Sequence, residues 1–262
     1  MSEHAGAELT VEGLTIRFGG LTAVDGISFE VRSGEVLSLI GPNGAGKTTA
    51  FNAITGYIAP AAGEIRYRDT RLNGLEPHAI AALGVVRTFQ KTSVFAGQSV
   101  QDNVAIGLHL RSRQRPLAIL LGLRSVAREE RELAREAVEI LRFVGLEPRA
   151  GQIAASLPYG ELRLLEVAVA LAARPRLLLL DEPVSGMNPV ETAGFMKLLA
   201  EIRALGITVL LVEHDMRMVM GVSDRIVCLN HGRIIASGTP GQIQRDAEVV
   251  RAYLGERYLH KA

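Results

Sequence analysis

Cysteine is nearly absent from this chain, since Cys228 is the only one among 262 residues. A single cysteine excludes an internal disulfide, and its position in the apolar run 225–229 predicts a buried thiol in a chain that fits a reducing cytosol. An excess of either charge is missing too, because the formal net charge is +1. Proteins dedicated to nucleic acid usually carry a marked basic excess, so this balance argues against such a function.

Long hydrophobic runs are also missing. Outside the expected core strands the longest apolar stretch covers residues 117–123, far below the roughly 20 residues that a membrane-spanning helix needs. Residues 1–8 are polar and contain no apolar signal core. There are no low-complexity tracts and no internal repeats. We therefore expect a chain that does not cross a membrane by itself, which leaves docking on a membrane surface open.

Apolar residues make up 48% of the chain, which at this length predicts one large domain or a core with a subdomain. Residues 9–40 alternate between apolar and polar side chains, as β-strands do. Further along, apolar strands alternate with helices, which favours a mainly parallel sheet covered on both faces. The expected strands include 36–40, 63–68, 85–88, 177–180, 207–212, 225–229 and 233–235, with a hairpin turn at 230–232, and the expected helices include 47–55, 125–144 and 162–172.

Between about residue 91 and residue 160 the pattern becomes helical and charged. Ser99 and Asp102 form a variant of the capping box that begins a helix. Arginines outnumber acids between 111 and 131, and they either cover a solvated helical face, which we favour, or lie near anionic lipid headgroups. The apolar face expected for a helical tail consists of Tyr253, Leu254, Tyr258 and Leu259. We expect a single domain over 1–262, with a core of about 1–90 and 161–239, a helical subdomain of about 91–160 and a C-terminal helical tail of 240–262.

A glycine-rich loop follows the expected strand 36–40. Its glycines let the backbone curl so that N–H groups face phosphate oxygens, and the next helix adds the positive end of its dipole. Lys47 then reaches the β- and γ-phosphates, and the Thr48 hydroxyl ligates a metal ion. A turn that only caps a helix is the disfavoured alternative. The predicted phosphate-binding residues are Gly41, Pro42, Asn43, Gly44, Ala45, Gly46, Lys47, Thr48 and Thr49.

Two acids, Asp181 and Glu182, follow the leucine run 177–180. A hard, partly hydrated Mg²⁺ prefers one or two carboxylates together with phosphate oxygens, so Asp181 is the better metal ligand. Glu182 points elsewhere and can take a proton from the attacking water or orient it. The alternative, two solvated acids at a strand end, is disfavoured by the phosphate loop upstream. The sequence therefore predicts binding and hydrolysis of a nucleoside triphosphate with Mg²⁺.

Two further polar residues follow expected strands. Gln90 comes after 85–88, where its amide could contact both Mg²⁺ and water and act as a sensor. His214 comes after 207–212, where it could bind the γ-phosphate and hold Glu182 or the water, because crevices at strand ends bind ligands. Taken alone, Gln90 is an ordinary loop residue and His214 a surface or capping histidine.

The segment 157–161 opens the expected helix 162–172, and the N–H groups at this helix N-terminus could face an anion. This pattern is weak by itself, because Pro-Tyr-Gly is also a common turn at the start of a helix. The order of the motifs makes it informative, because loop, glutamine, helix start, acidic strand and histidine follow one another along the chain. The segment consists of Leu157, Pro158, Tyr159, Gly160 and Glu161.

In this order the motifs resemble those of the ATP-binding cassette (ABC) ATPases over essentially the whole chain. Phe18 matches the aromatic position that stacks on adenine in that family, with a core phenylalanine as the alternative. The resemblance covers 41–48 as Walker A, Gln90 as the Q-loop, 157–161 as the signature, 177–182 as Walker B, the four residues Ser185, Gly186, Met187 and Asn188 as the D-loop, and His214 as the switch histidine.

The resemblance implies an α/β fold, a P-loop nucleotide-binding domain with a mainly parallel core sheet, an N-terminal antiparallel β-subdomain and an inserted α-helical subdomain. It also implies that complete sites form only between two chains, because each signature faces the γ-phosphate held by the partner's Walker A loop. ATP binding would close this dimer and hydrolysis would reopen it. The cofactors implied are ATP and Mg²⁺, and the metal shell would hold Thr48, Gln90 and Asp181.

The signature departs from the commonest form, Leu-Ser-Gly-Gly-Gln. Pro158 replaces the serine, Tyr159 the first glycine and Glu161 the glutamine, while Gly160 remains. Pro or Ala followed by Tyr-Gly is similar to the subfamily that serves branched-chain amino acid importers, and the stretch 181–189 agrees with it. Glu161 places an acid near a triphosphate, which bears on activation by the partner chain and not on ATP binding.

This resemblance implies the ATPase subunit of an importer for branched-chain or related hydrophobic amino acids. Its partners would be two membrane-spanning permease subunits, a second ABC ATPase subunit, with a heterodimer favoured, and an extracytoplasmic binding protein, but no nucleic acid. The subunit would lie peripherally on the cytoplasmic face of the inner membrane. Other cargo, such as urea, short amides or exported lipopolysaccharide, stays open, because other subunits recognise cargo.

Functions of other classes fit less well. A soluble ABC ATPase of ribosomes or DNA would carry two cassettes or long coiled coils, and neither is present in this sequence. A regulator that binds nucleotide without hydrolysis would have lost its base, whereas Glu182 is intact. A small-molecule kinase would not explain the signature segment or His214.

Overall fold

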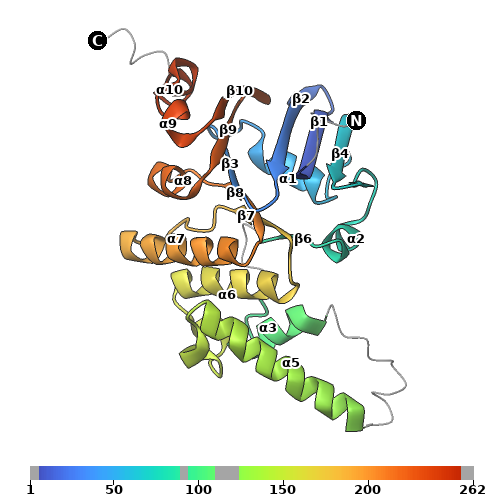
Figure 1. Cartoon of the computed structure of the whole chain (residues 1–262), viewed down its shortest axis with the longest axis vertical. Coiled ribbons are helices and arrows are strands. Elements are labelled where there is room, and N and C mark those ends of the chain that lie inside the picture. The colour runs from blue at the N-terminus through green and yellow to red at the C-terminus, as the bar shows by residue number, and fades with distance from the viewer. Residues whose placement is uncertain (1–5, 89–93, 110–123, 255–262) are drawn as a thin grey trace.

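The computed structural model describes residues 6–88, 94–109 and 124–254, which form two β-sheets surrounded by helices (Figure 1). Within these residues, no helix combines the length and the apolar character that crossing a bilayer requires.

The central sheet has six strands in the order β10-β9-β3-β8-β7-β6, and all neighbours are parallel except β10 and β9, which form an antiparallel hairpin. Every residue of the three middle strands is buried, as expected for a parallel sheet with both faces covered. The strands are β3 (Val36–Ile40), β6 (Val85–Arg87), β7 (Leu177–Asp181), β8 (Thr208–Val212), β9 (Arg225–Asn230) and β10 (Arg233–Gly238).

Successive residues of the central strands enter different cores. Leu178 and Leu180 pack with helices α6 (Tyr159–Ala172) and α7 (Pro189–Ala204) on one face of the sheet. Leu177 and Leu179 pack with α1 (Lys47–Ile54) and the second sheet on the other face. Because side chains along a strand alternate between faces, the leucine run supplies both cores.

The second sheet is antiparallel, with the strand order β2-β1-β4-β5. It lies beside α1 at the upper right of Figure 1. The parallel central sheet, the antiparallel N-terminal sheet and the inserted helices agree with the predicted fold class. The strands are β1 (Ala7–Phe18), β2 (Leu21–Arg32), β4 (Ala62–Tyr67) and β5 (Thr70–Arg71).

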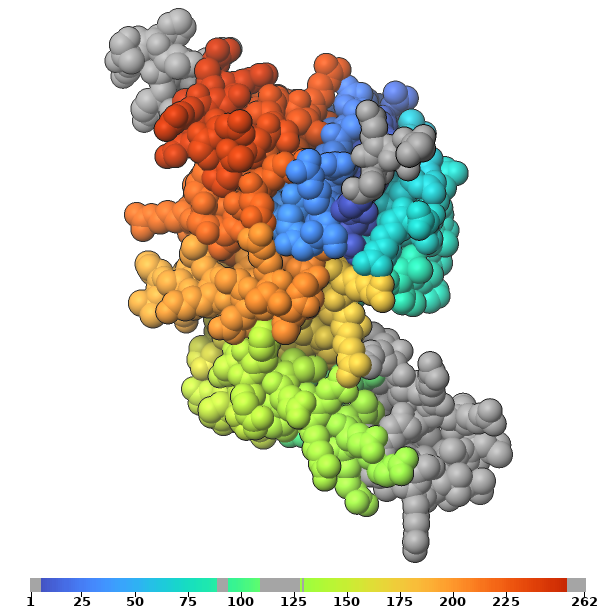
Figure 2. All heavy atoms as spheres, in the orientation of Figure 1, coloured from blue at the N-terminus to red at the C-terminus, as the bar shows by residue number. Residues whose placement is uncertain are grey.

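A helical layer packs on α6, on the side away from the antiparallel sheet. It consists of α3 (Val100–His109) and α5 (Arg124–Phe143), whose apolar faces join the core of α6. Figure 2 shows α5 as the yellow-green lower lobe of the surface. The Ser99 hydroxyl accepts the Asp102 N–H at 3.0 Å, so the predicted capping residue does begin α3.

The hairpin between β9 and β10 turns at His231 and Gly232, as predicted. Both residues have positive φ, 46° and 78°. Two such residues in succession form the type I′ turn, whose twist matches that of the flanking strands. The chain then continues into α9 (Pro240–Ile243) and α10 (Ala247–Leu254).

Some boundaries differ from the prediction. Helix α6 begins at Tyr159 and not at Leu162, because Pro158 is the N-cap residue, with an extended ψ of 153°, and the next residue is already helical. The predicted tail helix is interrupted at 244–246, so its described part forms two short helices. The predicted positions of Gln90, of Tyr258 and Leu259, and of most of the arginine-rich run lie outside the described residues. Helices α2 (Pro77–Ala82) and α8 (Met216–Val222) were not located from the sequence.

Candidate active site

Strand β8 lies between β3 and β7. It brings the phosphate loop and the acid pair Asp181 and Glu182 to one edge of the sheet, the edge at which the parallel strands have their carboxyl ends. Val212 pairs with Leu39 on one side and with Asp181 on the other. The phosphate loop therefore starts about two strand spacings, roughly 10 Å, from Asp181. Residues far apart in the sequence meet here because all three parallel strands end at the same edge.

The phosphate loop has a backbone that side chains would not permit. Gly41, Gly44 and Gly46 have positive φ of 148°, 80° and 103°. A Cβ on Gly41 would lie 2.1 Å from the Leu229 carbonyl oxygen, and one on Gly46 would lie 2.7 Å from that of Ala23. Gly41 and Gly46 are therefore required by close backbone approach as well as by conformation, and Gly44 by conformation alone.

Lys47 begins α1 and folds back over the loop. Its ammonium group donates to the carbonyl oxygens of Gly41 at 2.6 Å and Pro42 at 3.0 Å. Burial lowers the pKa of Lys47, and the nearby carboxylates of Glu182 and Asp181 oppose that shift. A buried cation thus stands between the glycine loop and the two predicted acids, where it can attract an anion.

Asp181 is buried at the end of β7 and is held from one side. Its Oδ2 accepts from the Arg87 guanidinium at 2.7 Å. Its Oδ1 is buried and has no hydrogen-bond partner among the described residues. Burial raises the pKa of Asp181, and Arg87 opposes the rise. A buried carboxylate oxygen without a donor costs free energy, so it is suited to an external ligand such as a metal ion or water.

The next residue turns the chain out of the sheet. Glu182 has a φ of 50°, an uncommon left-handed conformation for a side chain of this kind, and its N–H donates to Val212 at 2.8 Å. Its Oε1 lies 3.9 Å from Nδ1 of His214, a separation that is too long for a hydrogen bond. The structure thus brings Glu182 and His214 together at the edge of the sheet. The His214 side chain is 60% exposed, which agrees with the alternative of a surface histidine, whereas Asp215 and not His214 caps α8.

A third acid, which sequence reasoning missed, holds these two segments together. The carboxylate of Glu213 is fully buried, and its Oε1 accepts the N–H of Val184 at 3.0 Å. Its Oε2 accepts the N–H groups of His214 at 2.9 Å and Asp215 at 3.2 Å. Glu213 therefore fixes the backbone after Glu182 to the backbone that carries His214. The available signal was an acid at the end of a buried strand, where an unpaired charge would be costly.

The signature and D-loop segments contact each other. Gly186 lies so close to Tyr159 that an added Cβ would be 2.9 Å from the tyrosine ring. The Tyr159 hydroxyl accepts from the Arg163 guanidinium at 2.6 Å, while the side chain is 44% exposed. Because α6 begins at Tyr159, the first N–H groups of this helix have no partner within it. The segment can therefore present N–H donors at the surface.

Two other predicted residues have been placed. Asn188 caps α7, since its side chain accepts from Val190 at 2.9 Å and Glu191 at 3.0 Å. Phe18 is 49% exposed at the end of β1, so the alternative of a core phenylalanine is wrong. An exposed aromatic face is available for stacking on a flat ligand.

A family model for ABC transporters matches residues 24–185, which include the phosphate loop, the signature and both acids. The chain belongs to the ABC transporter family. A second model, for branched-chain amino acid ATP-binding cassette transporters, matches residues 233–258 of this ABC ATPase, the region that follows the hairpin turn.

Relatives resemble this ABC ATPase over nearly its whole length. The high-affinity branched-chain amino acid transport ATP-binding protein BraF of Pseudomonas aeruginosa is 45% identical over 95% of this chain and 98% of its own. The lipopolysaccharide export system ATP-binding protein LptB of Escherichia coli (strain K12) is 36% identical over 96% of this chain and 99% of its own. Among solved structures, the ATP-binding cassette MJ1267 in its ADP conformation has a TM-score of 0.84 and 32% identity, covering 95% of this chain and 99% of that one.

The role of Glu213 can be tested by Glu213→Gln. The amide keeps one acceptor but turns an NH₂ group toward donors, so the free energy of unfolding should fall by about 1–3 kcal/mol. The ATPase rate should fall too, because Glu182 and His214 lose their common anchor. Urea unfolding and phosphate release measure the two effects. Glu201→Gln on the exposed face of α7 is the control, and an equally stable, fully active Glu213→Gln variant would contradict the role.

Proposed function

We propose that this ABC ATPase is the ATP-hydrolysing motor subunit of an importer for branched-chain or related hydrophobic amino acids. The observation that carries the proposal is the 45% identity to BraF, which extends over nearly the full length of both chains. Identity to the lipopolysaccharide-export relative is lower, 36%, which favours amino-acid import over that alternative. The match of 233–258 to the branched-chain transporter model supports the same choice.

In this function the phosphate loop and Lys47 bind the triphosphate of ATP. Glu182 takes a proton from the attacking water or orients it, and His214 holds that arrangement. Phe18 stacks on the adenine. These roles fit the buried ammonium group of Lys47 beside the loop. They also fit the acidic Glu182 and the basic His214, whose side chains lie 3.9 Å apart at the carboxyl end of the strands.

The same site fits Mg²⁺. Asp181 offers a buried carboxylate oxygen that has no donor in the described part of the chain, and Thr48 follows the lysine of the loop, so these two residues would hold the ion together with Gln90. Bound Mg²⁺ would neutralise charge on the β- and γ-phosphates. The chain's own contribution is the Arg87 guanidinium, which holds the Asp181 carboxylate at 2.7 Å and opposes the rise in its pKa that burial causes.

The signature would serve the ATP of a second cassette subunit, for which we favour a different chain over a second copy. The N–H groups at the start of α6 and the adjoining D-loop form one surface, held together by the contact of Tyr159 with Gly186. Tyr159 and Gly186 are exposed there and Gly160 is buried, and the N-terminus of α6 favours an anion. The tyrosine that replaces a glycine of the common signature thus gains a contact with the D-loop.

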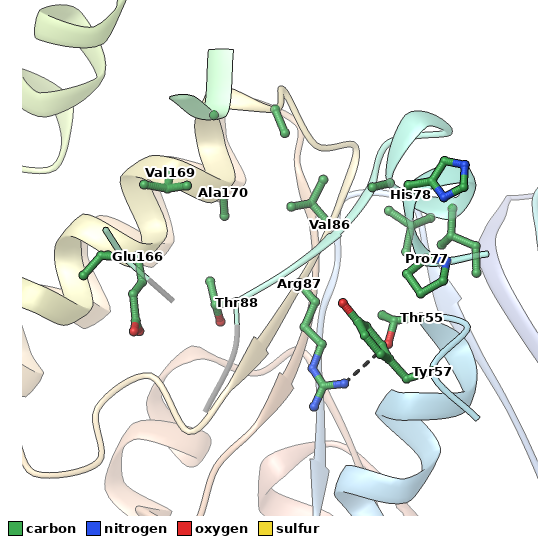
Figure 3. A pocket seen from close by; sticks show the side chains of 16 residues that line it. Thr55, Tyr57, Pro77, His78, Val86, Arg87, Thr88, Glu166, Val169 and Ala170 are labelled. Atoms are coloured by element: carbon green, nitrogen blue, oxygen red, sulfur yellow. Dashed lines mark hydrogen bonds between the residues drawn. The ribbon is translucent and has the colours of Figure 1, made fainter. Parts of the chain in front are cut away.

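The membrane-spanning partners would dock in a pocket between the core and the helical layer (Figure 3). The pocket has a volume of about 520 Å³. Its lining is largely apolar and comes mainly from α2, β6, α6 and the segment after α1. The lining residues include Tyr57, Pro77, Val86 and Val169. An apolar pocket of this size suits a short helix of a permease loop. We place the subunit peripherally on the cytoplasmic face of the inner membrane, with an extracytoplasmic binding protein on the other side.

Purification from membranes tests this function directly. The tagged chain should copurify with two permease subunits and a second ABC ATPase subunit, identified by mass spectrometry. Permeases of the lipopolysaccharide-export type, or no membrane partner at all, would overturn the cargo or the transport function respectively. The binding protein should join the complex only when permeases are present.

Replacing the proposed base tests the catalytic assignment. Glu182→Gln should reduce ATP turnover by at least about 100-fold, since general base catalysis typically contributes this much. ATP binding should remain, and a nucleotide-bound dimer should accumulate during size-exclusion chromatography with ATP. Glu201→Gln is again the control. Retained hydrolysis would sink the assignment of Glu182 as the base.

The departure at the signature gives a second test. Pro158 is the N-cap of α6 and makes no side-chain cap. A serine there could accept the N–H of Gly160 or Glu161, which is worth about 1 kcal/mol of helix stability. Pro158→Ser should therefore leave the ATPase rate of the assembled transporter unchanged or raise it. A severe loss of rate, with normal folding by circular dichroism, would mean that the local backbone requires proline.

A further inference from the structure

Arg87 lies between the docking pocket and Asp181 at the carboxyl end of β7. Its side chain lines the pocket together with Tyr57 and Val86, and Figure 3 shows it between that pocket and α1. The side chain is 6% exposed, so nearly all of it is buried in this wall. It belongs to β6, a strand of three residues at the edge of the central sheet that pairs with β7.

The guanidinium group bonds to two elements of the nucleotide site at once. It donates to Asp181 at 2.7 Å on one side and to Asn52 at 2.7 Å on the other, with a longer contact to Thr55 at 3.4 Å. Its central carbon lies 5.4 Å from the centre of the Phe51 ring. Asn52 and Phe51 belong to α1, which starts at Lys47, so one planar group connects the predicted metal ligand with the helix of the phosphate loop.

The arrangement fixes the direction in which Asp181 presents its second oxygen. Because Oδ2 accepts from Arg87, the atom left for a ligand is Oδ1, for which residues 6–88, 94–109 and 124–254 provide no hydrogen-bond donor. Nη2 of Arg87 donates to Asp181 while Nη1 donates to Asn52, so one rigid plane fixes the two acceptors relative to each other, whereas the ammonium of lysine has a single centre. A displacement of Arg87 would therefore rotate or release the Asp181 carboxylate.

We propose that Arg87 is a positioning residue that couples the filling of the docking pocket to the metal-binding carboxylate of Asp181. The proposal rests on the proposed function, since it assigns Mg²⁺ to Asp181 and the permease to the pocket. A helix seated in the pocket would press on the stem of Arg87, and the guanidinium would pass that displacement to Asp181 and to α1. Docking of the membrane partner would then change how tightly the subunit holds metal and nucleotide.

The pocket can be filled chemically without a permease. Val169 lines it on α6 and is labelled across from Arg87 in Figure 3. In a Val169→Cys variant, N-phenylmaleimide places an aromatic ring in the pocket. The native thiol does not compete, because Cys228 is buried and burial raises its pKa to about 11. The reagent therefore marks one position in the full-length chain.

The readout is the metal dependence of nucleotide binding. The affinity for a fluorescent ATP analogue is measured with Mg²⁺ and with EDTA, and Mn²⁺ binding is followed by electron paramagnetic resonance. Arg87→Gln should reduce the ratio of the affinity with Mg²⁺ to the affinity with EDTA by about tenfold. Arg87→Lys should reduce it by less, because lysine keeps the charge but loses the planar pair of guanidinium donors. Arg142→Lys, which alters an exposed ion pair with Glu147 in the helical layer, should leave the ratio unchanged.

Coupling is measured by combining the label with the substitution. Labelling the Val169→Cys variant should change the ratio by at least about threefold when Arg87 is present and leave it nearly constant when Arg87→Gln is added, as expected for residues in one network. An equal change in both backgrounds, or no change in either, would overturn the proposal. If Arg87→Gln fails to fold, Arg87→Lys carries the same comparison. Because this assay uses the chain without membrane partners, failure to copurify with permeases would count against the proposed function and not against the coupling.

Discussion

The insertion of β8 between β3 and β7 is the constraint on which the site depends. Parallel pairing in this order places the end of β3, and with it the phosphate loop, at the same edge as Asp181 and His214. A parallel sheet can be formed only if both faces are covered, and the alternating leucines of β7 supply both cores. The packing of the sheet's buried apolar residues thus brings together the polar residues at its carboxyl-terminal end.

At that edge the protein keeps several charges away from water and supports each with neighbouring groups. Lys47 bonds to loop carbonyls, Asp181 to Arg87, and Glu213 to three backbone N–H groups. Burying charges is costly, so groups held in this way are expected where a site needs them. Oδ1 of Asp181 has no hydrogen-bond donor within the residues that the structure describes, and this supports the assignment of a ligand to it. Arg87 links β7 to α1, and Glu213 links the segment after Glu182 to the segment that carries His214.

Much of this arrangement could be predicted, for identifiable reasons. Continuous apolar runs gave β3, β7 and β8 to within a residue, and the glycine spacing of 41–46 predicted the phosphate loop. Arg87 and Glu213 were not found, because a single charged residue at the end of a strand has no periodic pattern and its partners are distant in sequence. The segment 157–161 was correctly predicted to open a helix, but the helix begins at Tyr159 and not at Leu162, because Pro158 is the extended N-cap residue. For α7, the cap Asn188 and the following Pro189 were available signals that were not used.

ATP-driven uptake is the measurement that tests the central claim, a hydrolysis site coupled to amino-acid import. The chain and its copurified membrane partners are reconstituted into proteoliposomes with the binding protein, and uptake of labelled leucine is followed. The account predicts uptake that requires ATP and disappears with Glu182→Gln. Hydrolysis that proceeds at the same rate with and without the binding protein, and moves no leucine, isoleucine or valine, would contradict it.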